Sequence, residues 1–468
     1  MVNLHGSRGL VACIALSLVG LIGCTKPEGS GGNRGASTPP ASGPKSVAPA
    51  ETAKPAIADT KKPDDDKASD AKAGDGESSD LKAAKARIDA LGSRAKYEPK
   101  VGKTLTDIVI QDGSNLTADD IALFGKLGDL KKLQIFNCRT LNDEMAATLS
   151  GLKSLTSLAL TNTVINDATV ELIVKSFPNL TELDLSSNTN MTNGVVKIVS
   201  GLSKLQRLTL IQNQVNDIGA QRLAKLKDLR TLDMRGNMEA GDMALDVVAD
   251  LPKLTAFKHR STAVTDSGME YLTRSQTLES LLLQDFVITD QSGPHLAKLG
   301  KLSQLEVFRC QGFGSDGVMA LKGMGLTRLT LRDLPNVDDR AMEVFGDLPK
   351  LRRLYLHELP TVSDAGLKQL SALKSLELLD IWTVPQMTDA TVDVIATLPG
   401  LKELSIRATG VTDKCIEKLL EMPSLQTLTF KENGSVTAEG LKKLSTRKWS
   451  KLDLGASATA ESGEAAAP

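Results

Sequence analysis

Arginine and aromatic residues recur at a constant interval in the second half of the chain. Arg332, His357, Trp382 and Arg407 are each 25 residues apart, and Arg328 and Arg353 keep the same interval. Guanidinium groups bind carboxylates through paired hydrogen bonds, and Tyr, Trp and Arg dominate the energetic centres of protein interfaces. We therefore expect a surface that binds acidic groups if the fold brings these side chains together. Its candidate ligand-binding residues are Arg328, Arg332, Arg353, Tyr355, His357, Trp382 and Arg407.

A second candidate is the segment Gly-Phe-Gly-Ser-Asp-Gly at 312–317, which has the G-x-G-x-x-G spacing of a dinucleotide-binding loop. The internal repeat described below explains it better, because Ser315 falls in a column of helix N-caps and Gly317 in a column of first-turn glycines. The sequence contains no nucleophile elbow, no separated acid/base pair and no His/Cys set with zinc-ligand spacing. We predict a non-catalytic protein without a cofactor or a metal.

The composition excludes several classes of protein. The 468 residues include 56 Lys and Arg against 57 Asp and Glu, which gives a net charge of −1. This balance argues against a nucleic-acid-binding chain, which normally carries a basic excess. The chain is 41% apolar, too much for a wholly disordered protein. Five cysteines are too few for a disulfide scaffold of this length.

The central part of the chain repeats the pattern L-x-x-L-x-L, as in Leu351, Leu354 and Leu356. Fourteen steps lead from the first copy to the last, with a mean period of about 24.6 residues. One long repeat, from 278 to 305, is followed by a short one, from 305 to 326. The fifteen copies begin at residues 105, 130, 155, 180, 205, 229, 254, 278, 305, 326, 351, 376, 401, 425 and 449.

Each copy predicts a short strand, a turn and a helix. Alternating leucines indicate a strand with one buried face. A residue suited to a helix N-cap follows in each copy except the last, and often an Asp in the first helical turn, where the helix dipole favours negative charge. The predicted N-caps are Thr117, Asn142, Asn166, Thr192, Asn216, Gly241, Thr265, Thr289, Ser315, Asp338, Ser363, Thr388, Thr412 and Thr437.

Over about 350 residues this pattern resembles the leucine-rich repeat family, in its longer ribonuclease-inhibitor-like and F-box-associated class. The resemblance implies an α/β solenoid with parallel strands on the concave face and helices on the convex face. Two features depart from the family pattern. No F-box-like module precedes the repeats, and the Asn or Cys that usually follows the strand survives in only five copies: Cys138, Asn188, Asn213, Asn237 and Asn433. The link to ubiquitin ligases is therefore not carried over.

The N-terminal segment has Arg8 followed by an apolar run at 10–22, which is short for a membrane span. Residues 21–24, Leu-Ile-Gly-Cys, resemble a bacterial lipobox, and the resemblance implies acylation of Cys24. An ordinary secretory signal is the alternative. We expect a signal peptide at 1–24 and a disordered tether at 25–80, poor in residues that form a core. The expected location is the cell envelope, membrane-anchored and facing the periplasm or the exterior.

The remaining segments complete the expected organisation. Residues 81–104 form an N-terminal capping helix, or alternatively a partner-binding helix, because Leu81, Ala84, Ile88 and Leu91 share one helical face. The solenoid occupies 105–454, and a disordered tail occupies 455–468. Cys138, Cys310 and Cys415 are four or more repeats apart, too far for a disulfide at about 4.8 Å per repeat.

The concave face carries the functional hypothesis. Alternation places the third, fifth and seventh residues of each copy outward. In copies 229 to 401 these columns hold eight basic and three acidic residues, a net charge of +5, against −1 in the first five copies. We predict a protein partner bound there. The alternatives are an anionic envelope glycan with a sugar stacked on Trp382, a structural spacer without a ligand, and an arginine-rich face that is merely solvated.

Overall fold

A computed structural model describes residues 78–455. The predicted signal peptide with Cys24, nearly all of the tether and the tail beyond residue 455 lie outside the described residues. Within 78–455, no helix is both long enough and apolar enough to cross a membrane.

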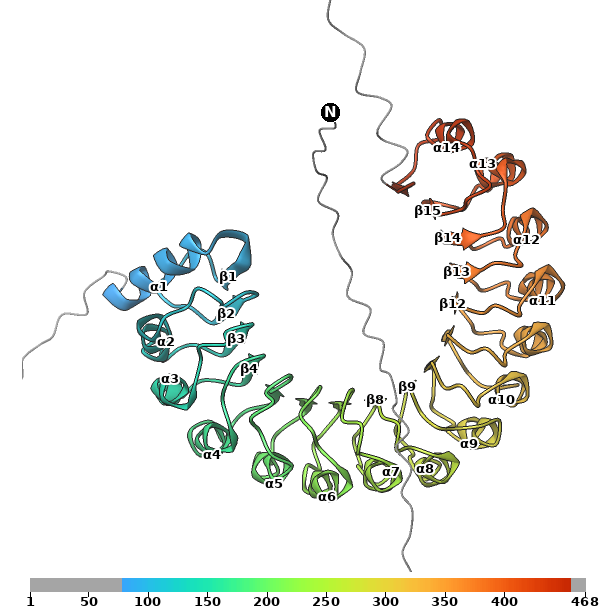
Figure 1. Ribbon diagram of the computed structural model, residues 1–468. Helices are drawn as coiled ribbons and strands as arrows, with labels where there is room; N and C mark the ends of the chain where they lie inside the picture. The colour runs from blue at the N-terminus through green and yellow to red at the C-terminus, as the bar shows by residue number, and fades with distance from the viewer. Residues whose placement is uncertain (1–77, 456–468) are drawn as a thin grey trace, which may run out of the picture. The chain divides into compact units, whose positions relative to one another are not determined.

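One sheet of sixteen strands runs through the described residues in strict chain order. β1 is antiparallel to β2, and every later pair is parallel. Figure 1 shows the strands on the inner side of an arc and the helices on its outer side, as the repeat predicts. The strands are β1 Ala95–Glu98, β2 Asp107–Ile110, β3 Lys132–Phe136, β4 Ser157–Thr161, β5 Glu182–Asp184, β6 Arg207–Thr209, β7 Thr231–Asp233, β8 Ala256–Arg260, β9 Ser280–Gln284, β10 Gln304–Phe308, β11 Arg328–Arg332, β12 Arg353–His357, β13 Leu378–Val384, β14 Glu403–Thr409, β15 Thr427–Lys431 and β16 Lys451–Asp453.

A helical segment follows each strand from β2 to β15. The α-helices are α1 Ser79–Ala90, α2 Ala118–Gly125, α3 Asp143–Ala147, α4 Asp167–Ser176, α5 Val195–Val199, α6 Asp217–Ala220, α7 Asp242–Ala249, α8 Asp266–Leu272, α9 Ser292–Ala297, α10 Ser315–Met319, α11 Asp364–Leu367, α12 Asp389–Ile395, α13 Ile416–Glu421 and α14 Ala438–Leu444. The 3₁₀ helices are η1 Gly92–Arg94, η2 Thr148–Gly151, η3 Gln221–Lys225, η4 Asp339–Asp347, η5 Lys368–Ala372 and η6 Asp413–Cys415.

The first helix of the described residues covers the end of the array. Ser78 caps α1, and the helix buries Leu81, Ala84 and Ile88. Arg87 on the same helix pairs with Asp120 of α2 at 2.8 Å between Nε and Oδ1. β1 then pairs with β2 in the antiparallel sense, so the first parallel strand has a hydrogen-bonded neighbour on its outer edge.

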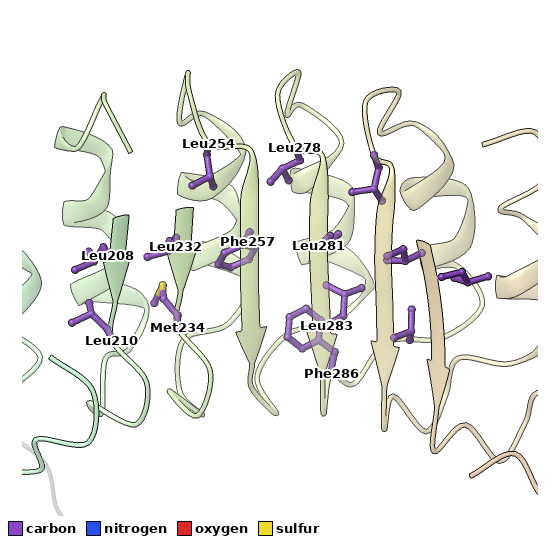
Figure 2. Close-up of a cluster of buried hydrophobic side chains, with 14 of the residues drawn as sticks. Leu208, Leu210, Leu232, Met234, Leu254, Phe257, Leu278, Leu281, Leu283 and Phe286 are labelled. Atoms are coloured by element: carbon purple, nitrogen blue, oxygen red, sulfur yellow. The ribbon is translucent and has the colours of Figure 1, made fainter. Parts of the chain in front are cut away.

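The core lies between the sheet and the helices. The fourth and sixth residues of each copy point into it, and in neighbouring strands these side chains stack on one another (Figure 2). Phe257, Leu283 and Leu331 are fully buried in this way. Burial of one such side chain stabilises a fold by about 2 kcal/mol. A ladder of aliphatic side chains can therefore form the core of a chain that has few aromatic residues.

The strand register corrects the predicted irregular pair of repeats. Leu305 is the Cα partner of Leu281 in β9 and of Leu329 in β11, so it is the second leucine of its copy and Leu302 is the first. Every repeat is therefore 24 or 25 residues long. The corrected frame places Phe308 on the concave face, Cys310 in the Asn/Cys column and Gly314 at the helix N-cap. The prediction of Ser315 as an N-cap is wrong, because Ser315 is the first residue of α10.

Most of the other predicted N-caps are confirmed, and the structure adds a second role for the Asp that follows them. Thr265 caps α8 through its side chain, and its backbone N–H also donates to Asp242 of the preceding repeat at 2.7 Å. Asp266 then accepts the N–H of Thr289 in the next repeat at 3.0 Å. The same contact is made by Asp143, Asp167, Asp217, Asp290, Asp339, Asp364, Asp389 and Asp413. We call these contacts the Asp–cap ladder.

Candidate binding surface on the concave face

The structure brings all seven predicted site residues together on four adjacent strands. Arg332, His357, Trp382 and Arg407 are successive Cα partners across β11 to β14. Arg328 and Arg353 are Cα partners in a second row, nearer the strand starts. Tyr355 lies in the middle row, between this row and that of His357. We call these seven residues the concave patch.

Trp382 is contacted by arginines from both sides of its strand. The guanidinium carbon of Arg332, on β11, lies 5.3 Å from the centroid of the Trp382 ring, and that of Arg407, on β14, lies 5.1 Å from it. Arg332 also lies 4.3 Å from the ring centroid of Phe308. Such cation–π contacts favour one arrangement of these side chains. Phe308 was missed from the sequence because the slipped register placed Gln311 in this row.

A second set of ring contacts joins the rows. His357 lies edge-on to Tyr355 at 6.0 Å and to Trp382 at 5.7 Å between ring centroids. The Arg328 guanidinium lies 4.8 Å from the centroid of the Tyr355 ring. The aromatic members of the patch therefore form one connected cluster.

The arginines in the Trp382 row are already paired with carboxylates. Arg332 Nη2 lies 3.4 Å from Glu358 Oε1, and Arg407 Nη2 lies 3.1 and 3.2 Å from the two oxygens of Asp380. Burial alone would raise the pKa of Asp380, but the contacts with His357 and Arg407 outweigh it and hold this pKa below its usual range. These two arginines thus neutralise acidic groups of the chain itself.

Arg328 and Arg353 differ from them. Among the residues 78–455, no carboxylate lies within 4.0 Å of either guanidinium. Arg353 is exposed and Arg328 is half-buried. Arg352, the residue before Arg353, does have a partner, because its Nη1 lies 3.3 Å from Glu377 Oε1.

The corrected register also lowers the charge of the concave face. With Phe308 in place of Gln311, and without Arg309, the three outward columns of copies 229 to 401 hold seven basic and four acidic residues, a net charge of +3. Arg309 lies beyond the strand end and shares Asp285 with Arg260. Burial alone would raise the pKa of Asp285, but Arg309 and Arg260 together hold it below its usual range. The net positive charge of the concave face is therefore smaller than the value of +5 predicted from the sequence.

Several buried polar atoms in the patch and beside it lack a hydrogen-bond partner. Within the described residues six side-chain atoms have this property, and three of them are Thr330 Oγ1, Arg332 Nε and His357 Nε2. His357 Nε2 does lie 3.4 Å from Asp380 Oδ2. Two hollows border the patch on the same face. One of about 180 Å³ is lined by Lys258 and Arg328 among others, and one of about 320 Å³ by Tyr355 and Arg407.

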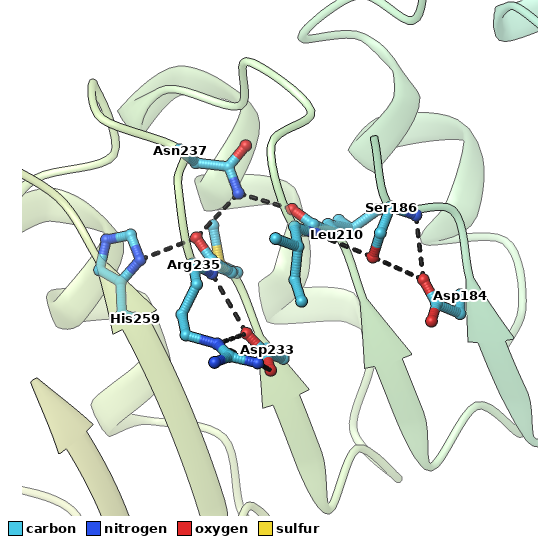
Figure 3. Close-up of polar contacts among 9 residues, drawn as sticks. Asp184, Ser186, Leu210, Asp233, Arg235, Asn237 and His259 are labelled. Carbon is cyan, nitrogen blue, oxygen red and sulfur yellow. Dashed lines mark hydrogen bonds and ion pairs between the residues drawn. The ribbon is translucent and has the colours of Figure 1, made fainter. Parts of the chain in front are cut away.

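Beneath the concave face, the Asn/Cys column satisfies the backbone at the strand ends (Figure 3). Asn237 donates to the carbonyls of Leu210 and Met234 at 2.6 and 2.8 Å, and its Oδ1 accepts the N–H groups of Asn213 and Val215. His259 is fully buried, with its ring nitrogens 3.1 and 2.8 Å from the carbonyls of Met234 and Ala240. Burial lowers the pKa of His259, so its ring is neutral at physiological pH.

The remaining candidate chemistry has a structural explanation. The N–H groups of Gly314 and Gly317 donate to Asp290 Oδ1 at 2.7 and 2.8 Å, so a carboxylate of the chain occupies the position that a phosphate would take in a dinucleotide loop. Cys310 and Cys415 are free and buried, and burial raises the pKa of each thiol to about 12. Among the described residues, no group of three or more His, Cys, Asp or Glu residues could hold a metal ion.

Comparisons with known proteins gave one family match and several similar solved structures. The model of the leucine rich repeat family matches residues 178–238. Similar solved structures include an internalin, inlF, from Listeria monocytogenes, at 20% identity and a TM-score of 0.46, over 70% of this chain and 94% of that chain. A chain of the Rad7 and Elc1 complex in yeast is 16% identical with a TM-score of 0.49, over 69% and 81% of the two chains. No curated protein matches the sequence.

Proposed function

We propose that the chain, a leucine-rich repeat protein, binds a protein partner through the concave patch and catalyses no reaction. The observation that carries the proposal is the cluster of Trp382, Tyr355 and four arginines on four adjacent strands. These residue types dominate binding hot spots, and rings that are already packed lose little freedom on binding. A solvated surface does not require such an arrangement.

The contacts of Trp382 favour a protein over a glycan. A sugar that stacks on this ring competes with the guanidinium groups of Arg332 and Arg407, which lie 5.3 and 5.1 Å from its centroid. A protein partner can contact the half-buried ring and the guanidinium nitrogens without displacing them. The anionic glycan therefore becomes the second candidate, and the spacer without a ligand is the outcome if no partner depends on the patch.

The proposal is tested by recovery of a partner from an envelope extract. We expect the wild-type chain to retain a defined protein, and Trp382→Ala combined with Arg332→Ala to lose at least tenfold of it. Arg274→Ala is the matched control, because Arg274 follows α8 and pairs with Asp246 and Asp250, away from the concave patch. Equal recovery by all three proteins would contradict the proposed function.

We further propose that acylated Cys24 anchors the protein to the membrane of the cell envelope. The apolar run and the residues at 21–24 support this step, and the tether at 25–80 would hold the solenoid at a distance from the membrane. In detergent phase partitioning, we expect Cys24→Ser to move the protein to the aqueous phase. Cys13→Ser, inside the same apolar run, is the control and is expected to leave the partitioning unchanged. An unaltered distribution of Cys24→Ser would contradict the anchor.

A further inference from the structure

We infer that Arg328 and Arg353 form the site that receives the carboxylates of an acidic peptide segment in the partner. The inference rests on the proposed function and deepens it, because it separates the arginines that bind the partner from those that organise the patch. Its basis is the unequal pairing of the four arginines: two have carboxylate partners in the chain, and two have none among residues 78–455.

The two unpaired arginines are direct neighbours. Arg328 and Arg353 are Cα partners on β11 and β12, so their backbones are about 4.8 Å apart. Like charges placed opposite each other across strands repel and cost stability. The sequence elsewhere on this face relieves such charges with Asp233, Asp285, Glu358 and Asp380. A partner carboxylate between the two guanidinium groups would supply the missing countercharge.

The surroundings of this pair add a third cation. The hollow of about 180 Å³ beside Arg328 is also lined by Lys258, which has no ion pair within the described part of the chain. Ser280 and Gln304 add a hydroxyl and an amide to the lining, and Glu306 is its single carboxylate. The charged lining residues therefore carry a net positive charge, and a segment with successive acidic residues can contact both the hollow and the arginine pair.

Apolar side chains on the other side of the pair indicate a peptide. Leu378 is half-buried and is the Cα partner of Arg353 on β13. Tyr355, also half-buried, holds the Arg328 guanidinium against its ring at 4.8 Å. An acidic peptide that also carries an apolar residue can bury it against Leu378, whereas a sulfated glycan has no such group. Planar guanidinium groups also match the geometry of carboxylates.

The test uses the purified full chain in non-ionic detergent and a fluorescein-labelled peptide, Glu-Glu-Leu-Glu-Glu-Leu, read by fluorescence anisotropy. We expect binding that weakens as salt is added, because the contacts are ionic. Arg328→Gln combined with Arg353→Gln should weaken it at least tenfold. Arg352→Gln, which removes the same charge one residue away from a guanidinium that Glu377 already pairs, should change it less than about twofold.

Three results would overturn the inference: no binding of the peptide, equal loss in the Arg352→Gln control, or equal binding of a Gln-Gln-Leu-Gln-Gln-Leu peptide. A sulfated hexasaccharide serves as the second probe, and a loss confined to that probe would transfer the site to a glycan. The partner recovered from envelope extract separates the two proposals. If Trp382→Ala abolishes recovery and the Arg328/Arg353 double variant does not, the proposed function stands and this inference fails.

Discussion

Polar residues occupy two very different regions of this solenoid. In the Asn/Cys column below the sheet, Asn237 makes four hydrogen bonds to backbone groups and is fully buried. On the concave face, the buried Thr330 Oγ1 and Arg332 Nε have no hydrogen-bond partner, and Arg353 is exposed without a countercharge. The first region stabilises the repeat, and the second leaves interactions unmade. The difference teaches that the pairing of individual side chains distinguishes the two regions better than their total charge does.

The largest effect expected from this comparison is at Asn237. Asn237→Ala removes four hydrogen bonds, to two carbonyls and two N–H groups, and at about 1 kcal/mol for each bond the free energy of unfolding falls by about 4 kcal/mol. Urea denaturation measures this loss. Asn179→Ala, at an exposed turn, is the control and is expected within about 0.5 kcal/mol. Similar losses in both variants would remove the distinction between the two regions.

A smaller effect on stability is expected at Asp285, which forms ion pairs with two arginines of the chain. Asp285→Asn leaves Arg260 and Arg309 without their shared carboxylate and costs about 2 kcal/mol at pH 7. Because the pKa of Asp285 is lowered in the folded state, its stabilisation is present above the unfolded pKa of about 4 and is lost as the pH falls through the folded value. Urea titrations at pH 7 and below pH 4 should show that the free energies of unfolding of the wild type and of Asp285→Asn become more similar as the pH falls. A constant difference would contradict the pairing.

Trp382 should have a still smaller effect on stability. Trp382→Ala removes contacts with two guanidinium groups on a half-buried ring, which amounts to about 1 kcal/mol. Thermal or urea unfolding measures it. A loss above about 3 kcal/mol would instead assign Trp382 to the core and weaken its use as a binding residue.

The smallest effect belongs to the unpaired arginines. Arg328→Gln combined with Arg353→Gln should change the free energy of unfolding by less than about 0.5 kcal/mol, with a slight gain at low ionic strength because a like-charge contact is relieved. The measurement is urea unfolding at two salt concentrations. A loss above about 1 kcal/mol would show that these arginines stabilise the fold.

The sequence was sufficient to predict the solenoid, the leucine ladder and the placement of the seven patch residues on one face. The error at one repeat has a simple physical origin. Leu299, Leu302 and Leu305 are spaced three residues apart, so the L-x-x-L pattern fits in more than one frame. Only the hydrogen-bonded register, with Leu305 opposite Leu281, distinguishes them. That single slip hid Phe308 on the concave face and Cys310 in the Asn/Cys column.

Ion pairing could not be predicted from the sequence in the same way. Asp333 and Glu358 both follow strands of the patch directly, so the sequence places either acid close enough to offset its charge. Of these two acids, Glu358 forms an ion pair with an arginine of the patch, Arg332. Which carboxylate reaches which guanidinium depends on side-chain conformation, which repeat periodicity does not encode. The division of the arginines into paired and unpaired therefore required the structure.

The Asp–cap ladder makes the array modular. Each Asp accepts a hydrogen bond from the backbone N–H at the helix start of the next repeat. Because this backbone group is present in every repeat, the contact does not depend on which repeat follows. Excision of one whole unit, such as 254–277, would bring Asp242 opposite Thr289 in place of Thr265, and the two share the same chemistry. Excision of half a unit would offer no such replacement. Length variants of this protein should therefore be tolerated in steps of one repeat, each step shifting the patch relative to the N-terminal cap.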